Sequence, residues 1–113
     1  SLESSDLFDE EEVKAKAEEV VQLLNAEDYA SLQEMTVEEV RSNMTKEKRD
    51  EEKEQIGSDW GEFQSIEEIS TAEMHQRNVK AAVVQMVVAY ENQDITYTLA
   101  FNTDMQLAAF GLQ

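Results

Sequence analysis

Two adjacent carboxylates are the groups in this sequence best placed to do acid–base chemistry. Glu67 and Glu68 lie in a segment whose apolar residues alternate as in a β-strand, so one of them must point toward the bulky face, beside Met86. A carboxylate in apolar surroundings has a raised pKa and can act as a general acid or base. The alternative is that a bulge or a strand end carries it into solvent, and we favour this second interpretation.

Three aromatic residues, Trp60, Tyr90 and Tyr97, are candidates to line the mouth of a pocket. Tyrosine offers an apolar ring with a polar tip, which suits a ligand cleft. Aromatic side chains on the bulky face of a sheet are more often plain core. We therefore keep these three, with Glu67 and Glu68, as possible pocket-lining residues and assign no catalytic residue.

The sequence lacks the residues that metal sites, nucleophilic catalysis and phosphate-binding loops need. His75 is the only histidine and falls at a predicted turn, without partners for a zinc site or a Ser/His triad. The chain has no cysteine and only three glycines, which excludes thiolate chemistry and a glycine-rich phosphate loop. The acidic residues of 47–54 lack the Glu-x-x-His pattern of a di-metal helix. We expect no metal and no cofactor.

The charge of the chain excludes several partners. Nine basic residues stand against 26 acidic ones, for a net charge of −17. Such a surface repels phosphate backbones and anionic lipid headgroups, and the only basic cluster, within 46–53, is interleaved with acidic residues. No apolar run approaches the roughly 20 residues of a membrane span. We expect no nucleic-acid partner and no membrane insertion of this domain.

The first half of the chain has a helical period. One helix is predicted from Asp9 to Asn25, and a short second helix is capped by Asp28. A capping box begins at Thr36. A charged helix, capped by Thr45, is predicted over 46–60. The apolar stripe of the first helix consists of Val13, Ala17, Val20, Val21 and Leu24. These medium and small side chains should pack against large ones on the sheet and close the base of the domain.

After Gly61 the period changes to two, which predicts four antiparallel strands. A two-residue turn at Asn92-Gln93 pairs Tyr90 with Ile95 and Val88 with Tyr97. A second turn, at 104–105, pairs Leu99 with Phe110 and continues the bulky face. The first strand, roughly Phe63 to Met74, fits two registers that differ by one residue, which a bulge could reconcile.

These patterns predict an α+β fold in which N-terminal helices pack on a curved, wholly antiparallel four-stranded sheet. We expect residues 1–8 to be a disordered polar leader and residues 9–113 to be one domain. The leader could be a spacer left after removal of an export signal, or an arbitrary boundary. The outer face of the sheet is expected to be apolar enough to support a homodimer, through Val79, Ala81, Val83, Val87 and Ala89.

Two segments, Leu23-Leu24-Asn25-Ala26-Glu27-Asp28-Tyr29 and Gly61-Glu62-Phe63-Gln64-Ser65-Ile66, together with the order of elements, resemble a bacterial family of unknown function in the nuclear-transport-factor-2-like superfamily. The resemblance implies a cystatin-like cone, with helices in the concave face of a curved sheet. It also implies an extracytoplasmic protein, secreted or lipid-anchored, that stands alone or beside a larger domain. Two turn positions where glycine is expected carry Glu27 and Met105 instead.

Three functions remain open at this point. The first is a non-catalytic accessory or binding module of an exported or surface-anchored bacterial protein. The second is a small pocket enzyme of the isomerase or dehydratase type that uses Glu67 or Glu68. The third is a structural homodimerisation domain. A ligand, if one binds, should be small, partly apolar and neutral or cationic, and should enter at the open end near Trp60.

Overall fold

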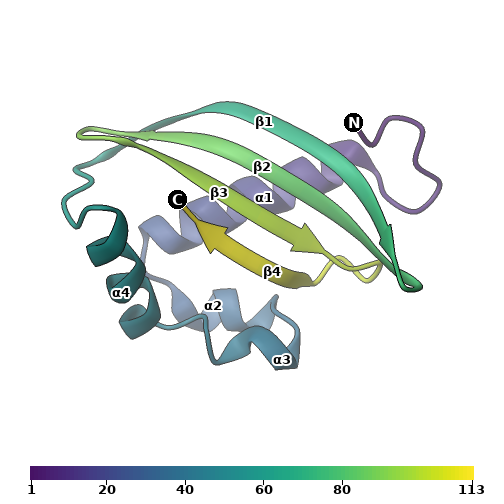
Figure 1. Ribbon diagram of the computed structural model, residues 1–113, viewed down its shortest axis with the longest axis horizontal. Helices are drawn as coiled ribbons and strands as arrows, with labels where there is room; N and C mark the ends of the chain where they lie inside the picture. Colours follow the sequence, from purple (N-terminus) through teal and green to yellow (C-terminus); the bar gives the residue numbers. More distant parts are fainter.

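The computed structural model describes residues 1–113 and places four helices before four strands (Figure 1). The elements are α1 (Glu10–Asn25), α2 (Tyr29–Glu34), α3 (Glu38–Arg41), α4 (Lys46–Ile56), β1 (Phe63–Gln76), β2 (Val79–Tyr90), β3 (Asp94–Phe101) and β4 (Leu107–Leu112). All strand pairs are antiparallel, in the order β1-β2-β3-β4. The predicted α+β fold is therefore confirmed.

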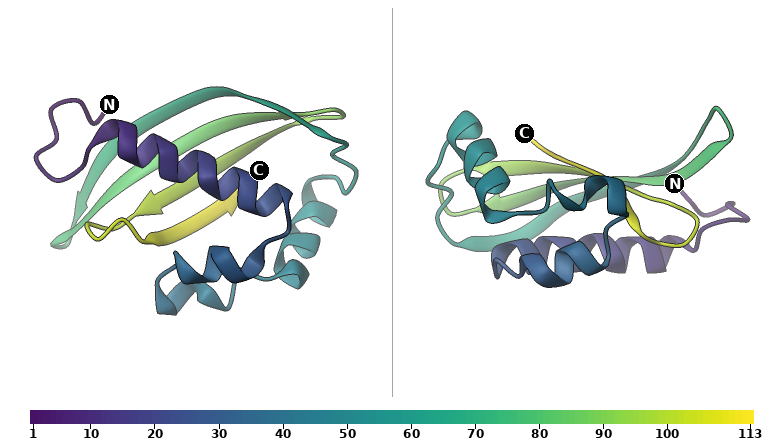
Figure 2. Two further views of the ribbon diagram at one scale, coloured as in Figure 1. Left: turned by 180° about the vertical axis from the view of Figure 1, so that it is seen from behind. Right: turned by 90° about the horizontal axis from the view of Figure 1, so that it is seen from below.

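The helices leave one face of the sheet open. The strands curve around α1, which runs across the concave, inner face, while α2, α3 and α4 gather beside β4 and the end of the β2–β3 hairpin (Figures 1 and 2). No helix lies over the outer face (Figure 1). The longest helix has 16 residues and many charges, and none of the four is long and apolar enough to cross a membrane.

The core lies between α1 and the inner face of the sheet. The apolar stripe of α1 is buried as predicted, with Val13, Ala17, Val20 and Val21 fully covered. Opposite it lie the large inner-face side chains Met86, Val88, Ile95, Tyr97, Leu99 and Phe101, also fully buried. Burying each large aliphatic side chain contributes about 1.5–3 kcal/mol, so this layer holds the base of the domain closed.

The pairing of β3 with β4 follows the predicted register from Tyr97 to Ala100 and then shifts, so that Phe101 faces Leu107 instead of Ala108. The pairing of β2 with β3 departs from the predicted register throughout. Leu99 faces Phe110 as expected, whereas Val88 faces Ile95 rather than Tyr97. The hairpin closes at Tyr90 and Gln93, one residue earlier than predicted, because the N–H groups of Glu91 and Asn92 bond to the preceding loop. Moving a two-residue turn by one residue shifts the register by two, so the same residues still face inward.

Strand β1 forms the predicted pair Ile66–Val88 near its start, but from Glu68 onward it takes a register that neither prediction gave. Ile66 lies opposite Val88, and after a shift Ile69 lies opposite Met86. Glu67 occupies the shift between them. A bulge bends a strand and leaves one residue unpaired, so no single register could describe this strand.

The helix caps are mostly those predicted. The side chain of Asp28 accepts from Ser31 N–H and that of Thr45 from Lys48 N–H. The prediction of a capping box at Thr36 is wrong. The Thr36 hydroxyl donates to the Leu32 carbonyl at 2.5 Å, and Thr36 forms a parallel bridge with Leu107. Helix α3 therefore begins only at Glu38. The buried bridge between Thr36 and β4 thus forms in place of the predicted helix cap.

Helix α4 is held by a buried arginine rather than by an apolar stripe. Arg49 is 4% exposed, lies 4.4 Å above the Phe110 ring and donates to the Asn43 carbonyl. It also pairs with Glu52 at 2.6 Å. The helix ends at Ile56, before Gly57 with φ 128°, and not at Trp60 as predicted.

Residues 1–8 pack against the domain instead of forming a disordered leader. Leu2 and Phe8 are 2% and 5% exposed and join the core, and the Ser5 hydroxyl donates to the Glu73 carboxylate. The polar composition of the segment suggested disorder, but two apolar side chains six positions apart are enough to anchor it.

Candidate functional site

The best candidate site is a surface hollow of about 460 Å³ at the end of the molecule where α1, α4 and the β2–β3 hairpin converge. Its walls come from four segments far apart in the sequence. The lining residues are Leu24, Asn25, Glu27, Lys53, Ser58, Asp59, Trp60, Gly61, Glu62, Phe63 and Tyr90. Two of the predicted pocket-lining residues, Trp60 and Tyr90, are among them.

Three other hollows are larger, at about 680, 510 and 500 Å³, but offer fewer groups suited to binding. The first is lined entirely by residues within 2–12, a single local segment. The second lies between α1, α2 and the β3–β4 turn and has mostly polar walls without an aromatic residue. The hollow of about 500 Å³ is lined by only 4 residues of α2 and α3, none of them aromatic. Ligand sites combine an apolar wall with a few placed polar groups, which favours the smaller hollow.

An aromatic cluster forms the inner wall of this hollow. The rings of Trp60 and Tyr90 lie 4.9 Å apart between centroids, and Phe63 meets Tyr90 edge-on at 6.0 Å. The indole N–H of Trp60 donates to the Gly57 carbonyl at 2.7 Å. Tilted and edge-on pairs are the favourable arrangements of aromatic rings, and the hydrogen bond fixes the orientation of the indole.

A chain of hydroxyl groups supports the cluster from behind. The Tyr90 hydroxyl donates to Asn25 Oδ1 and lies 2.6 Å from the Tyr97 hydroxyl, so Tyr97 donates to Tyr90. Burial raises the pKa of both tyrosines above the usual range. Both hydroxyls therefore stay protonated at neutral pH. Tyr97 is fully buried and does not reach the hollow, unlike the prediction that it could line the mouth.

The loop that carries Trp60 is clamped to the β2–β3 hairpin. Asn92 N–H donates to the Trp60 carbonyl, and Glu91 N–H to the Glu62 carbonyl. Between them Gly61 has φ 74°, and a Cβ atom there would lie 2.5 Å from the Glu91 Cβ. Only glycine tolerates this conformation and this approach, so the loop presents Trp60 from a rigid support.

A single lysine covers the Trp60 ring. The Nζ atom of Lys53 lies 4.7 Å from the ring centroid, within cation–π distance. Lys53 has no carboxylate within 4.0 Å, whereas Lys46, Lys48 and Arg49 on the same helix all form ion pairs. Trp60 as a whole is 5% exposed.

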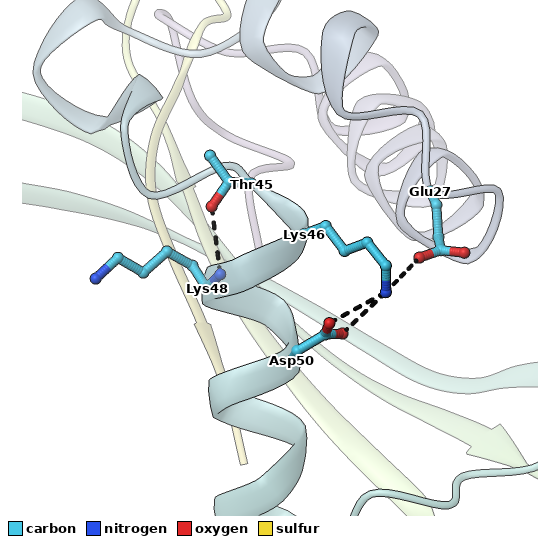
Figure 3. A network of polar contacts seen from close by, with 5 residues as sticks. All are labelled: Glu27, Thr45, Lys46, Lys48 and Asp50. Atoms are coloured by element: carbon cyan, nitrogen blue, oxygen red, sulfur yellow. Dashed lines mark hydrogen bonds and ion pairs between the residues drawn. The ribbon is translucent and has the colours of Figure 1, made fainter.

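Carboxylates surround the aromatic wall. Asp59 accepts from Gly61 N–H, and Glu62 forms no ion pair. Glu27 is reached by Lys46, which also bonds Asp50, at the capped start of α4 (Figure 3). The bonds to Asp50 and Glu27 raise the pKa of Lys46. These pairs are well exposed and contribute little stability, but they join the start of α4 to the end of α1.

The two carboxylates proposed for acid–base chemistry lie outside this site. Glu67 sits in the irregular stretch of β1, and Glu68 pairs with Val87 on the outer face. Both are exposed and neither lines the hollow. His75 is also exposed, near the end of β1, where its only side-chain partner is Glu73.

Of the lining residues, the sequence predicted only Trp60 and Tyr90; the others include three that shape the aromatic wall, Asn25, Lys53 and Phe63. Lys53 reaches Trp60 because the chain turns back between Gly57 and Gly61, and no local pattern reports that reversal. Phe63 carried a weak signal, since it begins a strand on the same side as Tyr90. Asn25 ends α1 as predicted, but the sequence did not indicate that its side chain accepts a hydrogen bond from Tyr90.

Comparisons with known proteins agree on the domain and give no function. The family model described as "Protein of unknown function (DUF3887)" matches residues 17–110. No curated protein matches the sequence. Among solved structures, the "NMR structure of protein from Ruminococcus gnavus ATCC 29149" is similar, with a TM-score of 0.79 and 29% identity over 94% of this chain and 92% of that chain.

Proposed function

The chain belongs to the DUF3887 family of proteins of unknown function, and we propose that it is a non-catalytic binding module whose ligand enters the hollow beside Trp60. The observation that carries the proposal is the convergence of Trp60, Tyr90 and Phe63 on one wall of the hollow. A rigid aromatic wall with a polar rim is the common form of a small-ligand site. The ligand class that fits is small, partly apolar and neutral or cationic.

The groups around the hollow support binding better than catalysis. The Tyr90 hydroxyl is committed to Asn25 and Tyr97, and burial raises its pKa, so it is a poor general base. The alternative of an isomerase or dehydratase that uses Glu67 or Glu68 has lost its geometric support, because both carboxylates are exposed away from the hollow.

A thermal-shift screen with small neutral and cationic compounds tests the proposal. A ligand of the hollow should raise the melting temperature of the wild type and of the Glu67→Gln/Glu68→Gln double variant, because neither carboxylate is near it. The same ligand should fail to stabilise Trp60→Leu, once circular dichroism has shown that this variant folds. Loss of ligand stabilisation in the double variant would favour the pocket enzyme instead.

A second candidate function is self-association through the outer face of the sheet. Ala72, Val83, Ala100 and Ala109 lie side by side across the four strands and form an uncharged row. Two sheets with small facing side chains can pack closely, at about 10 Å. In a chain of net charge −17, a second copy would meet least repulsion at this row, which favours a homodimer there.

The dimer should be weak to moderate and should depend on Val83. Sedimentation at increasing concentration should show a dimer for the wild type and a monomer for Val83→Glu. Gln22→Glu adds the same charge on an exposed position of α1 and should leave the dimer intact. A wild type that stays monomeric at every concentration would contradict this candidate.

We further infer that the chain is a member of the nuclear-transport-factor-2-like superfamily and works outside the cytoplasm, secreted or lipid-anchored. Its support is the resemblance of residues 23–29 and 61–66, together with the order of helices before a curved antiparallel sheet. Fractionation of bacteria that express the tagged full-length gene product tests the location, and recovery in the cytoplasm alone would contradict it.

A further inference from the structure

We propose that Lys53 is an internal occupant of a cation site on the Trp60 ring, and that the hollow takes a compact organic cation with a quaternary ammonium group. This inference rests on the proposed binding function and names the ligand class. Its starting point is one contact: Lys53 Nζ lies 4.7 Å from the centre of the indole.

The position of Lys53 shows where a cation is attracted on this surface. The chain has 26 acidic residues, yet the Lys53 ammonium lies over an aromatic face and pairs with none of them within 4.0 Å. The ring cannot turn away, because its N–H is bonded to Gly57. An ammonium group over the face of tryptophan is the strongest of the cation–π pairs.

The rim of the hollow adds a negative potential to the ring. Glu27, Asp59 and Glu62 line it, and Lys53 is the only cationic residue among the lining residues. Aromatic faces are the usual means of recognising quaternary ammonium groups, and the neighbouring carboxylates attract the same charge. The same potential repels anions, and a neutral ligand of equal shape would gain only the apolar part of the contact.

Lys53 must act as a competitor of such a ligand. Its flexible four-carbon stem can leave the ring, and the contact is worth about 0.5–1 kcal/mol at an accessible site. A free cation must displace it, which lowers the apparent affinity by about 2–5-fold. Removing the lysine should raise the apparent affinity for the cation by the same factor of about 2–5.

Three substitutions on α4 separate this mechanism from a general charge effect. Lys53→Ala removes the occupant and keeps helix propensity. Lys53→Arg supplies a better stacking group and should occupy the ring more fully. Lys48→Ala removes the same charge from the same helix at a residue outside the hollow, and serves as the matched control.

The test titrates each protein with choline and with 3,3-dimethylbutan-1-ol, its neutral isostere, at constant ionic strength. Trp60 is the only tryptophan, so its fluorescence reports the site directly. Choline should bind Lys53→Ala about 2–5-fold more tightly than Lys48→Ala, and Lys53→Arg most weakly. In every variant the isostere should bind less tightly than choline.

Three results would overturn the inference. If Lys53→Ala and Lys48→Ala bind choline equally, Lys53 is not an occupant of the site. If the neutral isostere binds as well as choline, the site does not select a cation, although a binding module at this hollow would stand. If neither probe changes the fluorescence of folded Lys53→Ala, the cation site is rejected, and the screen described above decides the proposed function separately.

Discussion

At the scale of single residues, the hollow depends on two buried hydroxyl groups that no ligand touches. Tyr97 donates to Tyr90, which donates to Asn25. The order of donors makes the two tyrosines unequal, because Tyr90 holds two partners and Tyr97 holds one. The hydroxyl chain therefore ties the end of α1 to β2 and β3 behind the aromatic wall.

This asymmetry predicts unequal costs for removing either hydroxyl. Tyr97→Phe leaves Tyr90 bonded to Asn25 and should lower the free energy of unfolding by about 1 kcal/mol. Tyr90→Phe leaves the fully buried Tyr97 hydroxyl without a partner and should cost about 1–3 kcal/mol. Urea unfolding of the three proteins measures both values. A larger cost for Tyr97→Phe would contradict the assigned order of donors.

A second residue-scale prediction concerns Glu10, whose carboxylate accepts from Thr71 Oγ1 at 2.6 Å and from Leu2 N–H at 3.0 Å. These bonds, that to Thr71 above all, lower its pKa from 4.5 to about 2. A lowered pKa in the folded state stabilises the protein above the unfolded value, and the gain is lost as the pH falls. Glu10→Gln should therefore be less stable than wild type at neutral pH, with the difference shrinking between pH 4.5 and about 2.

The difference between two proteins is the useful quantity here, because protonating other carboxylates also relieves the net repulsion of the chain. Glu12→Gln is the matched control, since Glu12 is exposed on the same helix and makes no side-chain hydrogen bond. Urea unfolding at a series of pH values measures all three. A Glu10→Gln difference that stays constant down to about pH 2 would contradict the role of the ionised carboxylate.

At the scale of elements, the turns hold residues in the left-handed backbone conformation. Glu27 and Met105, the two positions where the sequence suggested glycine, have φ 54° and 61° in the structure. A left-handed residue with a Cβ atom costs roughly 1–2 kcal/mol. Glu27 is exposed and follows the end of α1, so its backbone strain can be relieved without disturbing the core.

Glu27→Gly should accordingly stabilise the protein by about 0.5–1 kcal/mol relative to Glu27→Ala. Both substitutions remove the ion pair with Lys46, which is exposed and contributes little. The comparison of glycine with alanine therefore isolates the backbone, and thermal or urea unfolding measures it. Equal stability of the two variants would show that Glu27 carries no strain.

The strand faces could be predicted from the sequence because a period of two needs no knowledge of the turn. The cross-strand partners could not be predicted, because moving the turn by one residue shifts the register by two and leaves the faces unchanged. Val88 therefore lies opposite Ile95 instead of Tyr97. A shift of register also explains why both Glu67 and Glu68 are exposed. A strict alternation forces one of them inward, whereas the shift in β1 releases both.

The site was predictable in part. Trp60 and either Tyr90 or Tyr97 were predicted to line the open end, because the first helix closes the base of the domain and leaves room only there. Lys53 was not, because its contact with Trp60 depends on the positive φ angles of Gly57 and Gly61. The packing of Leu2 and Phe8 was missed because burial of a short segment depends on a partner surface that local composition does not describe.

At the scale of the whole molecule, the dominant feature is charge that the fold does not neutralise. Of the 26 acidic residues, only Glu27, Asp50, Glu51 and Glu52 pair with a lysine or arginine within 4.0 Å. The remainder repel one another more strongly in the compact state than in the unfolded chain. Folding is therefore opposed by a long-range force that salt can screen.

Added salt should accordingly stabilise this protein, the reverse of what a fold held by surface ion pairs would show. Raising NaCl from about 0.01 to about 1 M shortens the Debye length from about 30 to about 3 Å, and the melting temperature should rise throughout. A triple variant with Glu11, Glu18 and Glu19 changed to Gln, all exposed on α1, should melt higher at low salt and gain less from added salt, because less repulsion remains to be screened. Calorimetry at low protein concentration keeps self-association out of the measurement. An equal gain in both proteins would indicate that salt acts through apolar burial, which screening of charge does not affect.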